Sequence, residues 1–459
     1  MSSASPSPTD APGTGVTAAL AGWLAGLDRV AVTPRAQQAA RHAMLDWTGV
    51  TLAARDEPLV AALLRDALDH GEAGEVPLVG RPERLTGTFA ALVNGAASHA
   101  LDFDDVNSRV HGHPSVAILP AILAATQGRA ASGADVLDAL VVGTEVACAV
   151  GEMLGPAHYA QGFHATATVG TIGAAAAVAR LLGLDADRAA HALGLGATQA
   201  AGLKASFGTM AKPMHAGRAA MSGLLAARWA AAGLTGSTAA LEADQGLGMA
   251  MSPAFAAAFV PPAGAFGIER NCYKFYPACY YTHSAIAAAR ALADEHRLVP
   301  GDVASALIML QPQHDKVCNI AAPSDGLGIK FSVRHLVAMT LAGIDAGDPG
   351  VFTPEMAQRP DLVALRGRIA FEAAALPSRT AARVRLVLAD GRTLERAEDV
   401  GIPATDLGLQ EERLLAKFLA LAGPVLGEPR SKALADLILG LDGATGAGAL
   451  LAAMRSEAT

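Results

Sequence analysis

The chain has 459 residues, of which 52% are hydrophobic and only 4% are aromatic. This length suffices for two or three domains with a large buried core, and the scarcity of aromatic side chains favours close-packed helices with small residues at their contacts. The net charge of −8 argues against a nucleic-acid-binding protein, which needs a basic patch. The four cysteines form no CxxC pair, so they predict neither a disulfide framework nor a zinc or iron–sulfur site, and they favour the reducing cytoplasm.

The first part of the chain combines a short tail with a long helical region. Residues 1–15 are rich in Ser, Pro, Thr and Gly and lack the apolar core of a secretion signal, so we expect a disordered tail. Thr33 and Pro34 then open a helix as its N-cap and first residue. Helical spacing of small and apolar residues predicts further helices at 57–70, 85–101, 115–127, 133–153, 165–182, 186–203, 213–232 and 236–243. We find no run of about 18 apolar residues and therefore expect no membrane span.

The pattern changes near residue 267. Weakly alternating residues predict strands at 303–312, 367–372 and 382–388, and Asp390-Gly391 is a strong hairpin turn signal. Helices are expected at 277–297, 332–342, 407–422 and 430–441.

These elements predict a mainly α protein. We expect a large all-helical domain over 16–266 and an inserted smaller α+β lid domain over 267–403. The C-terminal helices, over 404–459, are expected to return to the helical domain.

The densest group of polar residues in this apolar chain lies between residues 98 and 115. Its members are His99, Asp102, Asp104, Asp105, His111 and His113. Carboxylates this close cannot all ionise freely, so at least one should have a raised pKa if the segment is buried. Ser115 is a plausible N-cap of the next helix, whose N-terminal field favours a neutral imidazole at His113. The alternatives are that the carboxylates cap helices or pair with arginines, or that His-x-His beside the aspartates binds a divalent metal ion.

Two further motifs place polar side chains at helix starts. His164 follows Gly162-Phe163 and precedes a small-residue helix, where it is either a site residue or a satisfied core histidine. Lys212 precedes Pro213 near another helix start, where a lysine opposes the helix dipole. With His215 and Arg218 on one helix face, Lys212 would form a receptor for a carboxylate or phosphate, the alternative being a set of solvated surface cations.

The last motif, Lys274 to His283, begins the α+β region. His283 is predicted to face the cleft between the domains, a common place for small-molecule sites. Cys279 lacks a neighbouring base in the sequence, so we interpret it as a packing residue rather than a nucleophile. The chain contains no GxGxxG after a strand, no P-loop and no GxSxG, which removes the usual support for nucleotide binding or serine hydrolysis.

The motifs at 46–50, 90–105, 113–115, 162–164, 212–215, 274–277 and 330–332, in this order, resemble the MmgE/PrpD family. This family includes 2-methylcitrate dehydratases, cis-aconitate decarboxylases and iminodisuccinate epimerases. The resemblance implies a helical domain with an α+β lid, a homodimer, an active site in the cleft between the domains, and no metal or organic cofactor.

Carried over by position, Asp102, His113, His164 and Lys212 match polar active-site residues of the decarboxylase branch. Cys279 stands where that branch has a further histidine. Val106 stands where it has a threonine, and one extra residue precedes His113. These departures argue against cis-aconitate decarboxylation and leave the other members open.

The predicted function is that of a cofactor-independent lyase that removes a proton next to a carboxylate of a small di- or tricarboxylate. A 2-methylcitrate dehydratase-like hydro-lyase comes first. An iminodisuccinate-type epimerase, a cis-aconitate-type decarboxylase and a catalytically silent binding protein are the alternatives. No nucleic acid or membrane partner is expected.

Each candidate site residue has a predicted role. His113 and His164 form the acid–base pair, Asp102 orients one of them, and Lys212 meets a substrate carboxylate. His215, Lys274 and His283 are predicted to bind substrate, and no residue is assigned to a metal or cofactor.

Overall fold

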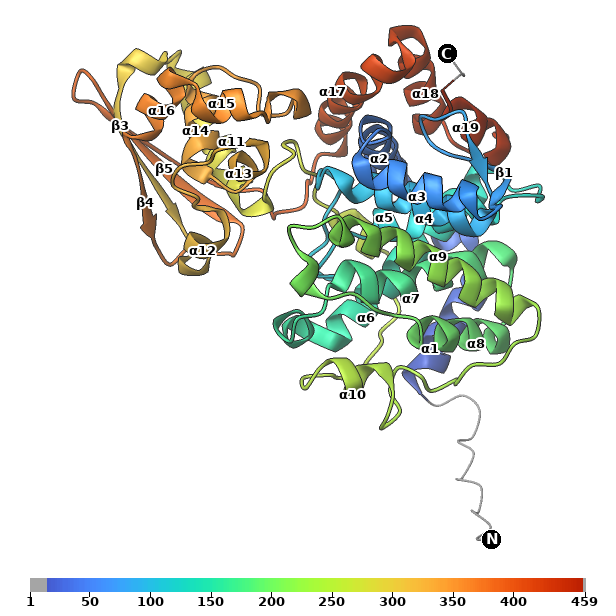
Figure 1. The fold of residues 1–459 in the computed structure, drawn as a ribbon. Coiled ribbons are helices and arrows are strands. Elements are labelled where there is room, and N and C mark those ends of the chain that lie inside the picture. The colour runs from blue at the N-terminus through green and yellow to red at the C-terminus, as the bar shows by residue number, and fades with distance from the viewer. Residues whose placement is uncertain (1–14, 457–459) are drawn as a thin grey trace. The chain divides into compact units, whose positions relative to one another are not determined.

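The computed structural model describes residues 15–456, which form two compact units. Unit 1 contains the chain up to Ala100, Asp104–Asn271 and the chain from Leu407 onward, and unit 2 contains Leu101–Phe103 and Cys272–Asp406 (Figure 1). The tail predicted at 1–15 lies outside the described residues except for Gly15.

Unit 1 is built from helices, with one short hairpin. The helices are α1 (Val16–Gly26), α2 (Pro34–Ala53), α3 (Pro58–Asp69), α4 (Gly87–Ala100), α5 (Ser115–Ala125), α6 (Gly133–Ala160), α7 (Ala165–Leu182), α8 (Ala186–Ala197), α9 (Ala211–Ala231), α10 (Leu247–Met251), α17 (Leu407–Leu426), α18 (Glu428–Leu439) and α19 (Ala447–Ala453). The hairpin pairs β1 (Ala73–Pro77) with β2 (Arg84–Leu85) and was not predicted. The mainly α class is confirmed, but the helix expected at 236–243 is wrong, because that segment forms turns.

Local signals fix the helix starts that the sequence indicates. The Thr33 hydroxyl accepts a hydrogen bond from the Ala36 amide at 3.1 Å, and Pro34 is the first residue of α2. The first amide groups of a helix have no hydrogen-bond partner within the helix. The Thr33 hydroxyl supplies a partner for one of them, and Pro34 has no amide hydrogen that needs one.

Glycines let the helices of unit 1 approach closely. A side chain at Gly217 of α9 would collide with the Leu92 carbonyl oxygen of α4, and one at Gly95 would lie 2.7 Å from the Gly217 Cα. These two helices carry His99 at the end of one and Lys212 at the start of the other. Backbone contact between α4 and α9 therefore sets the spacing of polar side chains far apart in the sequence.

We expect Gly217→Ala to lower the free energy of unfolding by about 1–3 kcal/mol, because overpacking forces the backbones of α4 and α9 apart. Chemical denaturation would measure the change. Gly22→Ala is the matched control, since nothing lies within 4 Å of a Cβ at this helical glycine. An unchanged denaturation midpoint for Gly217→Ala would show that α4 and α9 accommodate the added methyl group without loss of stability.

Helix α7 is long and apolar enough to cross a membrane by length and composition, contrary to the expectation that no segment would be. In the structure, 83% of its 18-residue window is buried within the protein. The core helix of a soluble protein passes the same test, so this finding is weak support for a membrane span.

The C-terminal helices pack on α2 through buried polar contacts. Lys417 of α17 donates to Asp46 at 2.6 Å, and both side chains are almost fully buried. His42 lies between Glu411, at 3.0 Å from its Nε2, and Gln410, at 3.0 Å from its Nδ1. These contacts join segments more than 360 residues apart within unit 1.

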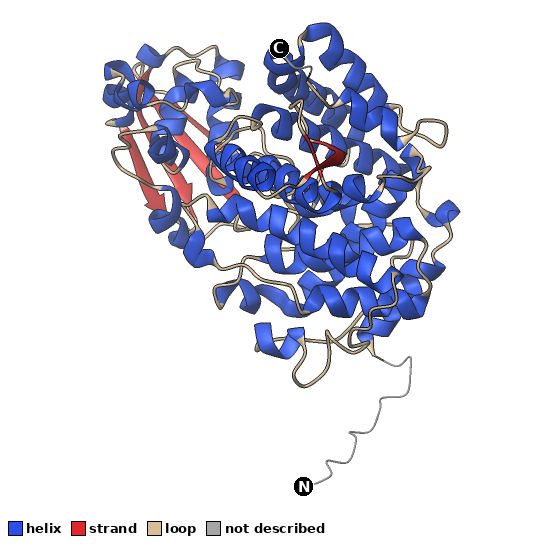
Figure 2. Ribbon diagram, turned by 45° about the vertical axis from the view of Figure 1, so that its right-hand side comes forward, coloured by secondary structure: helices blue, strands red, loops and turns tan. Residues whose placement is uncertain are grey.

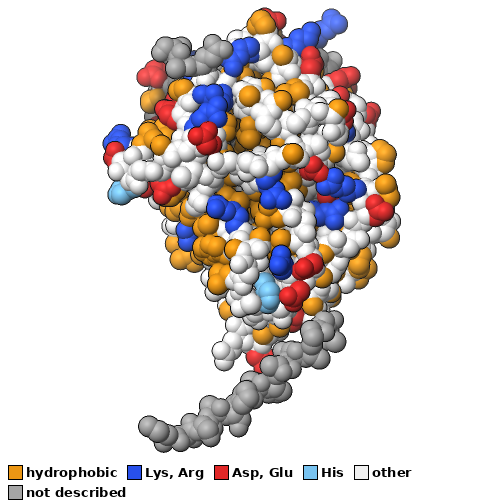
Figure 3. Space-filling model, turned by 90° about the vertical axis from the view of Figure 1, so that its right-hand side faces the viewer, with side chains coloured by type: hydrophobic (Ala, Val, Ile, Leu, Met, Phe, Trp, Pro, Cys, Tyr) orange, Lys and Arg blue, Asp and Glu red, His pale blue; other side chains and the backbone are white. Residues whose placement is uncertain are grey.

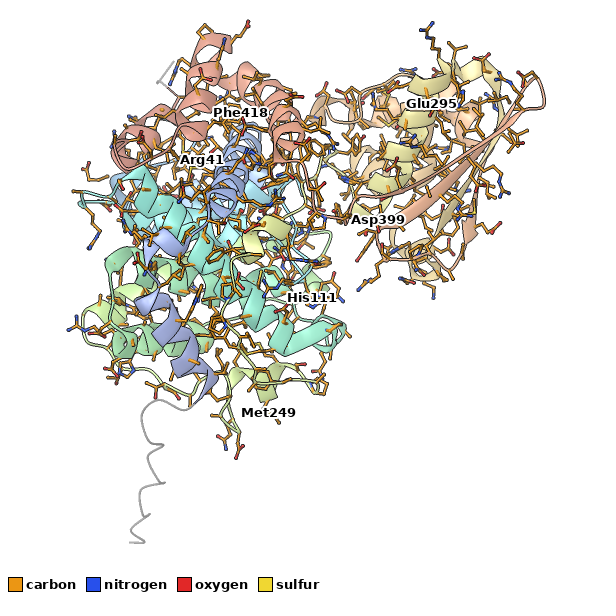
Figure 4. The ribbon with its side chains drawn as sticks, turned by 180° about the vertical axis from the view of Figure 1, so that it is seen from behind. Arg41, His111, Met249, Glu295, Asp399 and Phe418 are labelled. Carbon is orange, nitrogen blue, oxygen red and sulfur yellow. The ribbon has the colours of Figure 1, made fainter. Side chains whose placement is uncertain are left out.

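Two residues labelled in Figure 4 complete this packing. Phe418 of α17 lies against Gly49 of α2, and Arg41 of α2 donates to the Leu441 carbonyl at 2.8 Å. On the face of the molecule drawn in Figure 3, Lys and Arg side chains are scattered in small groups, some of them beside Asp and Glu, and they form no single basic patch on that face.

Unit 2 is an α+β unit around a four-stranded sheet in the order β4-β3-β5-β6. The strands are β3 (Val303–Leu310), β4 (Ile369–Ala373), β5 (Ala381–Leu388) and β6 (Thr393–Asp399). Its helices are α11 (His283–His296), α12 (Asp315–Cys318), α13 (Gly326–Lys330), α14 (Val333–Leu341), α15 (Pro354–Gln358) and α16 (Pro360–Arg366). Strands β3 and β4 are parallel, the other neighbours are antiparallel, and α11 and α14 pack on the sheet (Figure 2).

The three predicted strands and the hairpin turn are confirmed. Gly391 adopts φ 88° between β5 and β6, a left-handed conformation that favours glycine. The helix expected from residue 277 begins only at His283, after a 3-10 turn over Tyr280–Thr282.

Candidate active site

The loop between α4 and α5 is anchored by Asp105. Its carboxylate accepts from the Ser115 hydroxyl at 2.6 Å and from the Asn271 amide at 2.6 Å. Pro114, not Ser115, holds the N-cap position of α5, so the predicted capping role of Ser115 is wrong by one residue. Burial raises the pKa of Asp105 well above its ordinary value, and the nearby Asp46 and Asp104 add to this effect. The expected raised carboxylate is therefore found here, with desolvation as the main cause.

Asp104 lies between two imidazoles. Its Oδ1 is 2.9 Å from Nδ1 of His99, and its Oδ2 is 2.9 Å from Nδ1 of His113. The carboxylate is 1% exposed. Burial by itself raises the pKa of Asp104, but the charges and hydrogen bonds of the two rings outweigh burial and hold the pKa well below the ordinary value. Asp104 is therefore an ionised carboxylate that accepts hydrogen bonds from both sides.

His113 has a tautomer that its contacts determine. Its Nδ1 lies 2.9 Å from Oδ2 of Asp104 and 2.8 Å from the backbone carbonyl oxygen of Asp105. A carbonyl and an ionised carboxylate can only accept, so Nδ1 must carry the hydrogen. In the neutral ring the lone pair then sits on Nε2, which is the atom able to take a proton from a substrate.

His164 and His215 form the second imidazole pair. Their Nδ1 atoms are 3.2 Å apart, so one ring donates and the other accepts. His164 is the N-cap residue of α7, and its amide donates to the Gly202 carbonyl at 3.0 Å. Burial lowers the pKa of His164, assisted by neighbouring histidines and Lys212, so the ring is neutral at pH 7. Desolvation is the main cause of this shift.

The rings of His113, His99, His164 and His215 form a row. Neighbouring ring centres are 4.7, 5.9 and 5.4 Å apart, and the His99 and His164 planes are tilted by only 22°. His99 is 1% exposed, and burial lowers its pKa to about 4. The structure thus brings three predicted site residues together with His99, which had no predicted role.

Lys212 is the cation beside this row. It is the second residue of α9, and its Nζ lies 5.6 Å from the centre of the Phe207 ring. After burial, its charge is among the causes that lower the pKa of both His99 and His164. His215 and Arg218 lie three residues apart in α9, where His215 is 8% exposed and Arg218 is exposed.

Asp102, Lys274 and His283 belong to unit 2. Lys274 is 1% exposed and donates to the backbone carbonyl of Asp102 at 2.8 Å and to its carboxylate at 2.9 Å. Asp102 adopts φ 52°, a strained conformation for a non-glycine residue. The structure therefore shows Asp102 accepting from a lysine, and Asp104 is the carboxylate that lies 2.9 Å from His113.

His283 and Cys279 lie deep in unit 2. His283 is 2% exposed, with Nε2 3.2 Å from the Ala278 carbonyl oxygen. The rings of Tyr276 and Tyr280 meet it edge-on at 5.2 and 5.3 Å. Cys279 is 8% exposed and packs in the same core cluster as Cys318, which agrees with its interpretation as a packing residue.

The residues that sequence reasoning missed are His99 and Asp104. Both fall in the dense polar segment, but nothing local distinguishes Asp104 from its two neighbouring aspartates. His111, labelled in Figure 4, lies in the same loop with φ 56° and was also given no role. The usable signal was the density of polar residues in an apolar chain.

Distances alone would allow a metal ion at His99, Asp104 and His113, whose nearest ligand atoms lie within 4.8 Å of one another. The Nδ1 atoms of both rings, however, face the Asp104 carboxylate at hydrogen-bonding distance. A metal bound through these Nδ1 atoms would need their lone pairs, whereas the contact with the Asp105 carbonyl requires a hydrogen on His113 Nδ1.

We therefore expect dialysis against EDTA to leave any turnover of a carboxylate substrate unchanged. The rate before and after dialysis is the measurement, with added Zn²⁺ or Mg²⁺ as a control. Turnover that disappears on chelation and returns with a divalent ion would contradict this prediction.

Comparison with known proteins gives matches over both units. The sequence model of the MmgE/PrpD N-terminal domain matches residues 18–259, and that of the MmgE/PrpD C-terminal domain matches residues 276–442. Human cis-aconitate decarboxylase is 29% identical over 391 residues, covering 79% of this chain and 78% of the human protein. The cis-aconitate decarboxylase of Aspergillus terreus is 27% identical over 472 residues, covering 95% of each chain.

Proposed function

This chain belongs to the MmgE/PrpD family, and on that premise we propose that it is a lyase acting on a small di- or tricarboxylate. The reaction proceeds by acid–base chemistry that needs no metal or organic cofactor. The observation that carries the proposal is the His113 ring, whose Nδ1 lies 2.9 Å from the buried Asp104 carboxylate. This arrangement is suited to taking up a proton at Nε2.

The proton transfer follows from the contacts in unit 1. His113 Nε2 takes the proton from the carbon next to a substrate carboxylate, and the C–H electron pair moves into an enediolate that Lys212 stabilises. Asp104 stabilises the imidazolium that forms. The C–O bond to the hydroxyl then breaks, the electron pair forms a C=C bond, and the hydroxyl leaves as water after receiving a proton.

His164 is the proposed donor of that proton. Its ring is neutral in the ligand-free protein, and the negative charge of bound substrate carboxylates favours its protonation. The proposal assigns no step to Lys274 or His283, because Lys274 donates to Asp102 and His283 is 2% exposed.

Water elimination of the 2-methylcitrate type is the first candidate reaction. Val106 and Cys279 offer no polar equivalent of the threonine and histidine expected in the decarboxylase branch. Decarboxylation of cis-aconitate is the second candidate, favoured by the names of the relatives. Both reactions use the same proton-handling groups.

Proton NMR in D₂O tests the proposal with 2-methylcitrate, citrate and cis-aconitate as separate substrates. We expect C–H exchange together with loss of water from one of the hydroxy acids. Loss of CO₂ from cis-aconitate alone would favour the second candidate. Thermal stabilisation by these acids without exchange or turnover would favour a binding protein and contradict the proposed lyase.

We expect Lys212→Ala to lower kcat/KM by about 10- to 100-fold, because a hydrogen bond to a charged group contributes about 1.5–3 kcal/mol. Stability should change little, since Lys212 is partly exposed at a helix start. Lys316→Ala, at an exposed lysine of α12, is the control. Wild-type kinetics for Lys212→Ala would show that Lys212 does not bind the substrate.

A further inference from the structure

The buried ring of His99 has a single kind of polar contact. Its Nδ1 lies 2.9 Å from Oδ1 and 3.0 Å from Oδ2 of Asp104. Its Nε2 is buried and has no hydrogen-bond partner among the described residues. Burying an imidazole has a desolvation cost. Because the described polar contacts of this ring are all with Asp104, we expect its role to lie in what it does to that carboxylate.

The carboxylate of Asp104 is shared between two rings. An ionised carboxylate has enough lone pairs to accept from both. His99 Nδ1 lies 2.9 Å from Oδ1 and 3.0 Å from Oδ2, whereas His113 Nδ1 lies 2.9 Å from Oδ2. Without the His99 donor, the carboxylate could rotate about its Cβ–Cγ bond toward either neighbour. With it, Oδ2 is fixed toward His113.

We propose that His99 is a positioning residue, which holds the Asp104 carboxylate against Nδ1 of His113 so that His113 accepts a proton only at Nε2. The hydrogen-bond arrangement is inferred from geometry alone. Its effect on catalysis rests on the proposed function. His99 is not expected to touch the substrate.

The other groups around these rings do not supply this contact. The Asp105 carbonyl also accepts from Nδ1 of His113, which supports the tautomer but carries no charge. His164 stacks on His99 without a hydrogen bond to it among the contacts described, and Lys212 adds a positive charge near both rings. Asp104 is the anion within hydrogen-bonding distance of Nδ1 of His113.

The first test is ¹⁵N NMR of the ligand-free protein labelled at histidine, with signals assigned by single variants of the other histidines and the His99 signal assigned by elimination. We expect His99 and His113 both to carry their hydrogen on Nδ1, and both Nδ1–H signals to shift in Asp104→Asn. A hydrogen on Nε2 of His113, or a His99 signal indifferent to Asp104→Asn, overturns the proposal. This test requires neither turnover nor a folded His99 variant.

The second test uses pH–rate profiles of His99→Phe and His99→Asn. The phenylalanine keeps a ring but removes the donor, so the Asp104 carboxylate is no longer held against His113. We expect the acid limb of its profile to move to lower pH by about one unit and kcat to fall by about 10-fold or more. Asn retains an amide donor at the Nδ1 position and should restore most of the wild-type profile.

The matched control is His42→Gln, which alters a buried histidine in contact with Glu411 outside the site and should leave the profile unmoved. A folded His99→Phe variant with a wild-type profile overturns the positioning role. If no carboxylate is turned over, the proposed function fails, whereas the NMR test still decides whether His99 holds Asp104 against His113.

Discussion

His113→Ala is expected to lower kcat by at least about 10²-fold, since a general acid–base group contributes roughly 10²–10⁴-fold. The structural basis is the ring whose Nδ1 lies 2.9 Å from Asp104 and 2.8 Å from the Asp105 carbonyl. His164→Ala is expected to have an effect of similar size through loss of the acid. Steady-state kinetics with the substrate identified by NMR gives the measurement, and the wild-type pH–rate profile should be bell-shaped.

A matched substitution separates loss of chemistry from loss of fold. His296→Ala removes an exposed imidazole at the end of α11 and should retain wild-type kcat. Asp104→Asn should lower kcat comparably to His113→Ala, because the imidazolium loses its counter-charge. Near-normal kcat in both His113→Ala and His164→Ala would refute the acid–base assignment.

Acidification from pH 6.5 to about 4 is expected to destabilise the protein by several kcal/mol. The pKa of His99 is about 4 in the folded protein because of burial, against an ordinary value of 6.5. Between these pH values His99 is protonated in the unfolded chain and neutral in the folded protein. The free energy of unfolding therefore falls as the pH falls. For His99 alone this difference corresponds to about 3 kcal/mol.

Other buried groups determine the total. Burial also lowers the pKa of His42, His158, His164, His215, His314 and His335, which all act in the same direction. Asp105 acts in the opposite direction. Because its pKa is raised, it takes up a proton in the folded protein at a higher pH than in the unfolded chain, which stabilises the folded protein as the pH falls. The lowered pKa of Asp104 matters only below its ordinary value of 3.8, where its stabilisation is lost.

Urea denaturation at pH 7, 5.5 and 4.5 measures this effect. We expect the midpoint to fall at each step. In His99→Asn the fall should be smaller, because one of the histidines that resist protonation is gone. A midpoint independent of pH across this range would show that the histidines are protonated in the folded protein without cost.

Much of the fold follows from local sequence. Thr33 and Pro34 start α2 and Asp390-Gly391 turns β5 into β6 because these residues satisfy backbone requirements by themselves. The helix predicted at 236–243 fails because tertiary contacts hold the segment. The Gly236 carbonyl lies 2.8 Å from His191 Nδ1, and Glu242 accepts from the Thr17 amide at 3.2 Å. The first contact uses a backbone carbonyl that a helix would have paired within itself, and the second ties the Glu242 side chain to α1.

The sequence by itself determined that polar chemistry gathers between residues 98 and 115, because charge is scarce elsewhere in an apolar chain. It could not determine the separate roles of Asp102, Asp104 and Asp105. The left-handed backbone at Asp102 and the close packing around α4 send their side chains to different partners. These are Lys274 for the first, two histidines for the second, and Ser115 with Asn271 for the third. Side-chain direction in an irregular loop depends on the backbone turns that distant helices impose, and so only the tertiary structure decided which carboxylate serves His113.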